Sequence, residues 1–334
     1  MNSNRPRGAR PIAGLGLAVS GALTLGVVAA LPAAADTPDS ASVTDGTLTI
    51  VGSSASEALA LRLAAGDPTT LQVDFGDDGS PEHSFDRTTF SAIHVLLRSG
   101  DDRFRVDQVN GAFADELLTV DGGQGDDTLA GGDGAELFLG GTGNDNVDGN
   151  RGVDTAQLDE GNDTFRWDPG DGSDVVEGGP NFDTLDFRGN NTPEIMSLTA
   201  DGDHVVFLRD QANIRMDLDR VERLGLTTLG AADTVTIGDL SGTDFRQADI
   251  DLSAADTAAD VVSVIGTDKA DRIDVTRDGA QVSVSGLQVT THITGSAPND
   301  QLQVHSGDGD DDVVVDPAVL GLIAVSVDLG AVEA

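Results

Sequence analysis

Residues 122–166 divide into five units of nine residues: GGQGDDTLA, GGDGAELFL, GGTGNDNVD, GNRGVDTAQ and LDEGNDTFR. The same type of residue returns at the same place in each unit. An acid recurs at Asp127, Glu136, Asp145, Asp154 and Asp163, with an apolar residue two positions later and a glycine two positions earlier. Three registers kept over five units identify a true internal repeat, which is the first feature to look for in a chain of unknown fold.

Two of these units, GGQGDDTLA and GGTGNDNVD, match every position of a known nonapeptide. They resemble the GGxGxDxUx repeat of RTX (hemolysin-type) calcium-binding proteins, which forms a parallel β-helix. The resemblance implies a β-roll in which the first six residues of a unit make a turn and the last three a short strand. It also implies that two units complete a coil and that Ca²⁺ lies between stacked turns.

The residue types fit that implication on physical grounds. Glycine allows a turn with positive φ and lets backbone carbonyls approach a cation, since no Cβ is in the way. Ca²⁺ takes six to eight oxygen ligands at about 2.3 to 2.6 Å, which one short turn cannot supply but two stacked turns can. The expected stacked pairs are Asp127 with Asp145, Glu136 with Asp154, and Asp145 with Asp163. Without metal these carboxylates repel one another, so we expect calcium binding to drive folding of the roll.

The predicted metal ligands come from the repeats and from three later acids. The carboxylates are Asp127, Glu136, Asp145, Asp154, Asp163, Asp174, Asp183 and Asp311, and the backbone carbonyls are those of Gly123, Gly125, Gly132, Gly134, Gly141, Gly143 and Gly152. The spacing slips by two before Asp174, which lies eleven residues after Asp163, and we expect a longer strand there. Glu136 is longer than aspartate, and Asn150, Leu158 and Asp159 replace glycines, so these units depart from the pattern.

The fold class expected is all-β: a parallel β-roll or β-solenoid of these repeats, flanked by degenerate β-solenoid or hairpin segments. The predicted segments are 36–110 (N-terminal, β-rich), 111–190 (the calcium-binding roll) and 191–334 (C-terminal, β-rich), the last with one isolated repeat-like unit near 306–314. Short alternating apolar runs in the flanks are typical of strands. A separate β-sandwich at either end is the alternative, and Ser56–Ala65 is the best helix candidate.

The first 35 residues predict export. They contain no acid, carry three arginines before an apolar run from Ile12 to Leu31, and end in Pro-Ala-Ala-Ala. This is the pattern of a secretory signal peptide covering residues 1–35, so we expect a secreted, extracellular protein without stable membrane insertion after cleavage. An uncleaved membrane anchor is the alternative, because the run is about long enough to span a bilayer.

Composition excludes several other functions. The chain has 19 Lys+Arg against 58 Asp+Glu, and 49 of those acids are aspartate. A net charge of −39 excludes ordinary nucleic-acid binding, which needs a basic face. There is no cysteine, so disulfides, thiolate metal sites and cysteine nucleophiles are excluded as well. The excess of aspartate points instead to turns and metal loops.

The function expected is calcium binding that folds the roll, with Ca²⁺ as the cofactor. No H-E-x-x-H or G-x-S-x-G motif occurs, and the five histidines, among them His204 and His292, are interpreted as surface or strand residues, so no enzyme is predicted. One alternative is a secreted hydrolase that uses the roll as a folding or export module and has its catalytic residues in the flanks. Another is an adhesive or matrix-forming structural protein with a cell-surface or matrix partner, which the flanks do not identify.

Overall fold

Two large sheets, built from strands that alternate along the chain, make up the fold in a computed structural model that describes residues 39–253 and 257–330. Sheet A contains, in spatial order, β1 (Ser40–Thr44), β2 (Thr47–Val51), β6 (Ala92–Leu96), β8 (Leu117–Gln124), β10 (Glu136–Thr142), β12 (Thr155–Glu160), β14 (Val175–Glu177), β18 (Ile214–Asp219), β17 (His204–Arg209), β16 (Ile195–Asp201), β20 (Thr234–Ile237), β22 (Val261–Ile265), β26 (Gln301–His305) and β28 (Ala324–Asp328).

Sheet B lies on the other side of the core. Its strands, in spatial order, are β27 (Asp312–Val315), β23 (Arg272–Asp278), β24 (Gln281–Ser285), β25 (Thr290–Thr294), β21 (Gln247–Asp251), β19 (Arg223–Thr227), β15 (Thr184–Arg188), β13 (Thr164–Trp167), β11 (Asn146–Asp148), β9 (Thr128–Ala130), β7 (Arg103–Asp107), β3 (Ala58–Ala64), β4 (Asp67–Phe75) and β5 (His83–Asp86). Three short 3₁₀ helices complete the described elements: η1 (Arg87–Thr89), η2 (Gln211–Asn213) and η3 (Pro317–Gly321).

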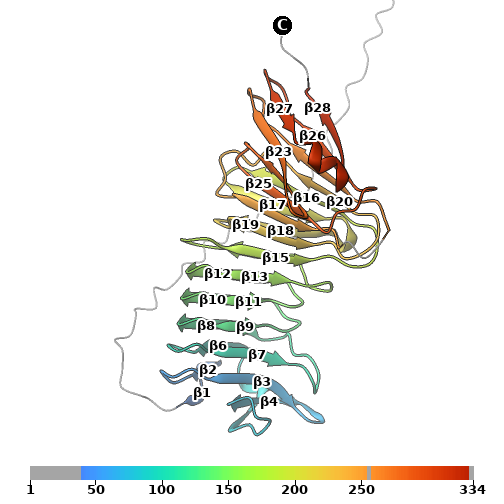
Figure 1. Cartoon of the computed structure of the whole chain (residues 1–334). Coiled ribbons are helices and arrows are strands. Elements are labelled where there is room, and N and C mark those ends of the chain that lie inside the picture. Colours follow the sequence, from blue (N-terminus) through green and yellow to red (C-terminus); the bar gives the residue numbers. More distant parts are fainter. Residues whose placement is uncertain (1–38, 254–256, 331–334) are drawn as a thin grey trace, which may run out of the picture. The chain divides into compact units, whose positions relative to one another are not determined.

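Each coil of the roll contributes one strand to each sheet, and successive coils stack in parallel (Figure 1). The register pairs Val120 with Phe138 and Leu129 with Val147, so residues eighteen apart lie side by side. Strands β9 and β11 have three residues, as the resemblance implied. Strand β10 continues into Gly140 and Gly141 of the next unit, and β12 continues into Leu158 and Asp159, which replace those glycines. The all-β, solenoid-type fold expected from the repeat is confirmed.

The flanks continue the same two sheets and are interrupted by antiparallel insertions. The strands β16, β17 and β18 form one such meander within sheet A, and β23, β24 and β25 form another within sheet B. A third, β3 to β5, lies at one edge of sheet B. Every strand described belongs to one of the two sheets, so no separate β-sandwich occurs among residues 39–253 and 257–330.

The helix candidate Ser56–Ala65 is wrong, because most of it forms strand β3. Leu59, Leu61 and Leu63 are buried in the core, which requires the two-residue period of a strand. Between them Arg62 is also buried, and its guanidinium pairs with Asp74 on β4 at 2.5 Å. Tertiary packing and this ion pair therefore override the helical preference of the Ala and Leu residues.

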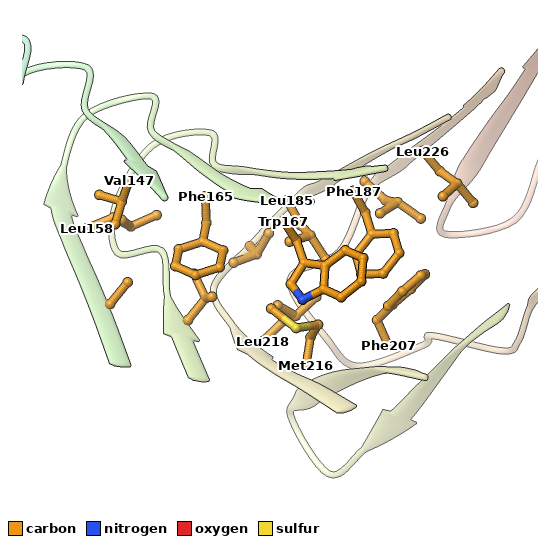
Figure 2. Packing of buried hydrophobic residues seen from close by; sticks show 14 of the residues in the cluster. Val147, Leu158, Phe165, Trp167, Leu185, Phe187, Phe207, Met216, Leu218 and Leu226 are labelled. Atoms are coloured by element: carbon orange, nitrogen blue, oxygen red, sulfur yellow. The ribbon is translucent and has the colours of Figure 1, made fainter. Parts of the chain in front are cut away.

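The core is a single apolar column between the sheets. Each strand of the roll contributes few inward residues, and these stack from coil to coil, as Val147 and Phe165 do. Within this column, the Trp167 and Phe187 rings stack with their centroids 4.1 Å apart (Figure 2). The Trp167 indole donates to the carbonyl of Gly172, in the turn where the repeat spacing slips by two.

That slip occurs mainly in a turn. Strand β13 has one residue more than β11, but the rest of the insertion is the turn from Asp168 to Asp171, in which the N–H of Asp171 donates to the Asp168 carbonyl. Residues 1–35, where the signal peptide is predicted, lie outside the described residues. Within the described part of the chain, no helix is long and apolar enough to cross a membrane.

Candidate metal centre

Buried acids link successive coils through their backbones. In each step, one carboxylate oxygen accepts a hydrogen bond from the backbone N–H of the acid one coil earlier. Asp145 Oδ1 accepts from the Asp127 N–H at 2.8 Å, and Asp163 Oδ1 accepts from the Asp145 N–H at 2.7 Å. Asp154 Oδ1 accepts from the Glu136 N–H at 2.8 Å. The structure thus brings together all three acid pairs that the sequence places eighteen residues apart.

This acid ladder runs far beyond the repeats. Before the strands of sheet B it joins Glu57, Asp102, Asp127, Asp145, Asp163, Asp183 and Glu222, and further on Asp271 and Asp311. Before the strands of sheet A it joins Glu136, Asp154 and Asp174, and further on Glu194, Asp233, Asp260 and Asp300. The predicted ligand Asp311 therefore stacks on Asp271, forty residues earlier.

Eight ladder acids are not among the ligands predicted from the sequence: Glu57, Asp102, Glu194, Glu222, Asp233, Asp260, Asp271 and Asp300. A signal for them exists, because each stands two residues before an apolar residue that faces the core, as Asp271 does before Ile273. What is missing is a fixed period. The flanking insertions separate successive ladder acids by 25 to 45 residues, whereas the regular roll keeps 18.

The second carboxylate oxygen behaves differently in the roll. The Oδ2 atoms of Asp127, Asp145, Asp154, Asp163 and Asp183 in the roll, and of Asp102 in the coil before it, are buried and accept no hydrogen bond. The side chains concerned are at most 2% exposed, so bulk solvent does not reach them. A buried carboxylate oxygen without a partner carries a large desolvation cost. Each of these oxygens therefore requires a positive partner, either a proton or a cation.

Backbone carbonyl oxygens lie close to the glycines that also adjoin the unpaired carboxylate oxygens. A Cβ atom added to Gly122 would lie 2.5 Å from Asp127 Oδ2 and 2.7 Å from the Gly140 carbonyl oxygen. At Gly140, a Cβ would lie 2.5 Å from both Asp145 Oδ2 and the Leu158 carbonyl oxygen. Only glycine leaves this space open. The carboxylate oxygen of one coil and a carbonyl oxygen of the next therefore lie close to the same glycine, in a space that no side chain can occupy. No hydrogen-bond donor is among the nearest atoms.

The predicted carbonyl ligands occupy the same turns. The carbonyl oxygens of Gly123, Gly125, Gly134, Gly143 and Gly152 each point at the glycine stacked one coil later, and a Cβ there would clash with them. Gly141 lies in strand β10 and pairs with Asp159. The Gly132 carbonyl differs, because it already accepts a hydrogen bond from the Arg151 N–H at 3.0 Å. Positive φ angles at Asn150 and Asp159 show that the replacements for glycine keep the left-handed turn.

Three ladder acids in the C-terminal flank, Glu194, Asp271 and Asp300, have hydrogen-bond donors for the second oxygen as well. Asp300 Oδ2 accepts from the Ala297 N–H at 2.6 Å, and Asp271 Oδ2 accepts from the Thr267 N–H at 2.7 Å. The Glu194 carboxylate accepts from the Asn190 N–H and from the buried Arg209. In the roll, Glu136 does the same, because its extra methylene lets Oε2 reach the Gly132 N–H at 3.0 Å.

Burial shifts the titration of the roll carboxylates. Desolvation raises the pKa of Asp127 and Asp163 to about 7, although a backbone N–H donated to each carboxylate opposes the shift. It raises the pKa of Asp145 to about 6 and that of Asp154 to about 9, the latter with added repulsion from Glu136. Asp127, Asp154 and Asp163 therefore hold protons near neutral pH to a large extent, unless a cation supplies the compensating charge.

The donor set suits a hard cation. Carboxylate and carbonyl oxygens are the ligands of Ca²⁺. Within the described ranges, no three His, Asp or Glu side chains converge on one point, so a cation held here would take much of its coordination from backbone carbonyls. The residues that could hold it are the unpaired roll aspartates and the carbonyls that face them. The donor chemistry, the unpaired oxygens and the space kept open by glycine all fit such an ion.

Comparisons with known proteins add little to this geometry. No family model matches the chain, and no curated protein matches it either. Among solved structures, the chain is similar to the extracellular lipase LipA from Serratia marcescens, at 10% sequence identity and a TM-score of 0.20. That similarity covers 64% of this chain and 43% of the lipase chain, so it spans less than half of the lipase.

Proposed function

We propose that the chain is a secreted calcium-binding protein whose roll binds Ca²⁺ between stacked turns and folds on binding. The observation that carries the proposal is the row of buried Asp Oδ2 atoms that face backbone carbonyls and accept no hydrogen bond. A cation between coils would neutralise the carboxylates and join two turns at once. Because each coil buries few apolar side chains, metal binding would contribute a large share of the folding free energy.

The expected location supports the same ion. The acid-free leader of residues 1–35 predicts export, and extracellular calcium modules work at dissociation constants of about 10⁻⁴ to 10⁻³ M. A net charge of −39 also favours a role in which cations bind along the chain. We therefore assign Ca²⁺ as the cofactor and the extracellular medium as its source.

Circular dichroism of the chain from Asp36 onward tests the proposal. We expect far-UV spectra to show a gain of β structure on titration with Ca²⁺ to millimolar levels. Mg²⁺ is expected to have little effect, because it demands near-ideal octahedral geometry and keeps its water. A spectrum that is fully folded in chelator and unchanged by Ca²⁺ would overturn the proposal.

A matched pair of variants tests the position of the sites. Asp145 belongs to two stacked pairs, whereas Asp312 is exposed and only approaches Arg272, at 3.5 Å. We expect Asp145→Ala to raise the calcium midpoint of folding and Asp312→Ala to leave it unchanged. Equal midpoints for the two variants would count against the assigned register.

A further inference from the structure

The outer face of sheet B has a depression of about 350 Å³ away from the acid ladder. It lies over β15, β19, β21, β24 and β25. Gly225 on β19 sits between Asp186 and Asp249 in one cross-strand row of outward residues, and the missing side chain opens the space. Arg223, Gln247 and Gln281 contribute polar groups to the lining.

A histidine and an aspartate meet at this depression in a fixed orientation. His292 Nδ1 lies 2.8 Å from Asp249 Oδ1, on the neighbouring parallel strand. Asp249 is itself held by the Arg223 guanidinium at 2.5 Å and by the Gln247 amide at 2.9 and 3.0 Å. The contact at Nδ1 leaves Nε2 as the imidazole nitrogen that can exchange a proton with a substrate.

A serine stands on the other side of that histidine. Ser283 on β24 is directly opposite His292 in the antiparallel pair β24·β25, and both residues face outward. Directly opposed residues on one face have Cβ atoms about 4.5 to 5.5 Å apart, so Ser283 stands next to the imidazole, on the side away from Asp249. The Gln281 amide donates to Ser283 Oγ at 3.1 Å, which places a neutral donor beside the hydroxyl.

We propose that Ser283, His292 and Asp249 form a hydrolytic triad that acts on small uncharged carboxylic esters. Ser283 is the nucleophile, His292 the general base and acid, and Asp249 the positioning residue. This is the arrangement in which Nδ1 contacts the carboxylate and Nε2 takes the serine proton. The acidic lining of Asp186 and Asp251 disfavours anionic esters, and the shallow depression favours short acyl groups.

The reaction balances with water as the only co-reactant. Ser283 Oγ bonds to the ester carbonyl carbon while its proton passes to His292 Nε2, and the Gln281 amide donates to the oxyanion. The carbon–alkoxy bond then breaks, and the leaving oxygen takes that proton to give the alcohol. Water next attacks the acyl-serine with His292 as base, which releases the carboxylic acid and restores Ser283.

Hydrolysis of p-nitrophenyl butyrate by the full chain in millimolar Ca²⁺, with intact mass after a fluorophosphonate probe, tests the proposal. We expect saturable hydrolysis and one phosphonyl adduct, mapped to Ser283. Ser283→Ala is expected to abolish the adduct and to lower kcat/KM at least about 100-fold. Asp249→Asn is expected to lower kcat by a similar factor with KM little changed, because the aspartate orients the base without touching the ester.

Two control variants separate the triad from general effects on the sheet. Ser285→Ala removes a serine from the same face of β24, two residues away, and is expected to keep full activity and labelling. His204→Gln removes another His–Asp pair, His204 with Asp217 at 3.1 Å, whose antiparallel neighbour is Asp201 and not a serine. Equal hydrolysis by Ser283→Ala and the unchanged chain, or labelling elsewhere than Ser283, would overturn the triad. The calcium sites are untouched by either result.

Discussion

Asp145 in the roll and Asp300 in the C-terminal flank hold the same place in two different settings. Both are 2% exposed, and both accept a backbone N–H from the acid one coil earlier, Asp127 at 2.8 Å and Asp260 at 3.0 Å. They differ in the second oxygen. Asp300 Oδ2 accepts from the Ala297 N–H at 2.6 Å, whereas Asp145 Oδ2 accepts from nothing.

The comparison shows that the same stacked acids are completed in two different ways, with a hydrogen-bond donor for the second oxygen in one region and without one in the other. At Asp271 and Asp300 in the C-terminal flank, a turn N–H donates to the second carboxylate oxygen, so these links between coils need no cation. In the roll, the glycine-rich turn brings carbonyls to the second oxygen in place of a donor, so the link is incomplete without a cation. From our proposal it follows that the roll depends on calcium and the C-terminal coils around Asp271 and Asp300 do not, although both belong to the same two sheets.

Removal of calcium is expected to have the largest effect, and to be confined to the roll. A site that holds its ion at 100 times the dissociation constant gains about 2.7 kcal/mol, which is about a 100-fold change in amide protection. Hydrogen exchange with mass spectrometry should therefore show faster exchange in residues 122–183 after chelation. Peptides from β24 to β26 serve as the internal control. Equal loss of protection in both regions would contradict the division.

Alanine substitutions at the two compared positions sharpen the difference. Asp145→Ala and Asp300→Ala each leave a buried backbone N–H without an acceptor, which costs about 1 to 3 kcal/mol. Asp145→Ala also removes a calcium ligand, so its destabilisation should be larger in Ca²⁺ than in chelator. Denaturant unfolding in both media measures this. If Asp300→Ala showed the same dependence on calcium, the flanks would bind the ion as well.

The roll could be predicted from its sequence because each coil there has a constant length. Eighteen residues per coil place Asp127, Asp145 and Asp163 in one column, and the glycine spacing marks the turns. The flanks keep the same rule, an acid two residues before an inward apolar side chain, but insertions vary the coil length. Asp271 and Asp311 are forty residues apart because β24 and β25 lie between them along the chain. Spacing alone cannot find such a pair.

The sequence pattern also could not predict whether the second carboxylate oxygen of a ladder acid has a hydrogen-bond donor. Glu136 reaches the Gly132 N–H, while Asp127 does not reach the equivalent group in its own turn. That difference arises from one methylene and from the local turn geometry. The meeting of Asp249, Ser283 and His292 was equally hidden, because the antiparallel hairpin β24·β25 determines which residues are opposed.

Acidity is expected to act on the roll in opposite directions with and without calcium. Burial raises the pKa of Asp127 and Asp163 to about 7, from 3.8 for an ordinary aspartate. The metal-free fold therefore binds protons that the unfolded chain releases, and this stability is present below pH 4 and lost as the pH rises through 7. Each proton contributes about 1.4 kcal/mol per pH unit within that window.

Calcium competes with those protons, so its midpoint should fall as the pH rises, up to about tenfold per unit for each proton released. Unfolding midpoints in chelator and calcium titrations, both between pH 5 and 8, measure the two trends. His204, whose pKa is raised by its hydrogen bond with Asp217, shifts stability in the same direction. Comparison with Asp145→Asn measures the part due to that one carboxylate, whose pKa burial raises to about 6. Metal-free stability that increases over this range would refute the prediction.

Asparagine at the two compared positions should have effects of opposite sign in chelator. In Asp145→Asn, the side-chain oxygen still accepts from the Asp127 N–H, and the new NH₂ replaces the unpaired Oδ2 next to the Leu158 carbonyl. A buried charge becomes a neutral donor facing an acceptor, which should stabilise the metal-free chain by about 1 kcal/mol. The same variant should lose part of its response to calcium, because an amide nitrogen cannot bind the ion.

In Asp300→Asn, the side-chain oxygen still accepts from the Asp260 N–H. The new NH₂ group then replaces Oδ2 and points at the Ala297 N–H. Two donors then face each other in a buried turn, and rotation of the amide only moves the conflict to the other side. We expect a loss of about 1 to 3 kcal/mol, equal in chelator and in calcium. The thermal unfolding midpoints of Asp145→Asn and Asp300→Asn, measured in chelator and in calcium, test both expectations. Equal signs would mean that the second oxygen of Asp145 already has a donor, and that the roll needs no cation to complete its ladder.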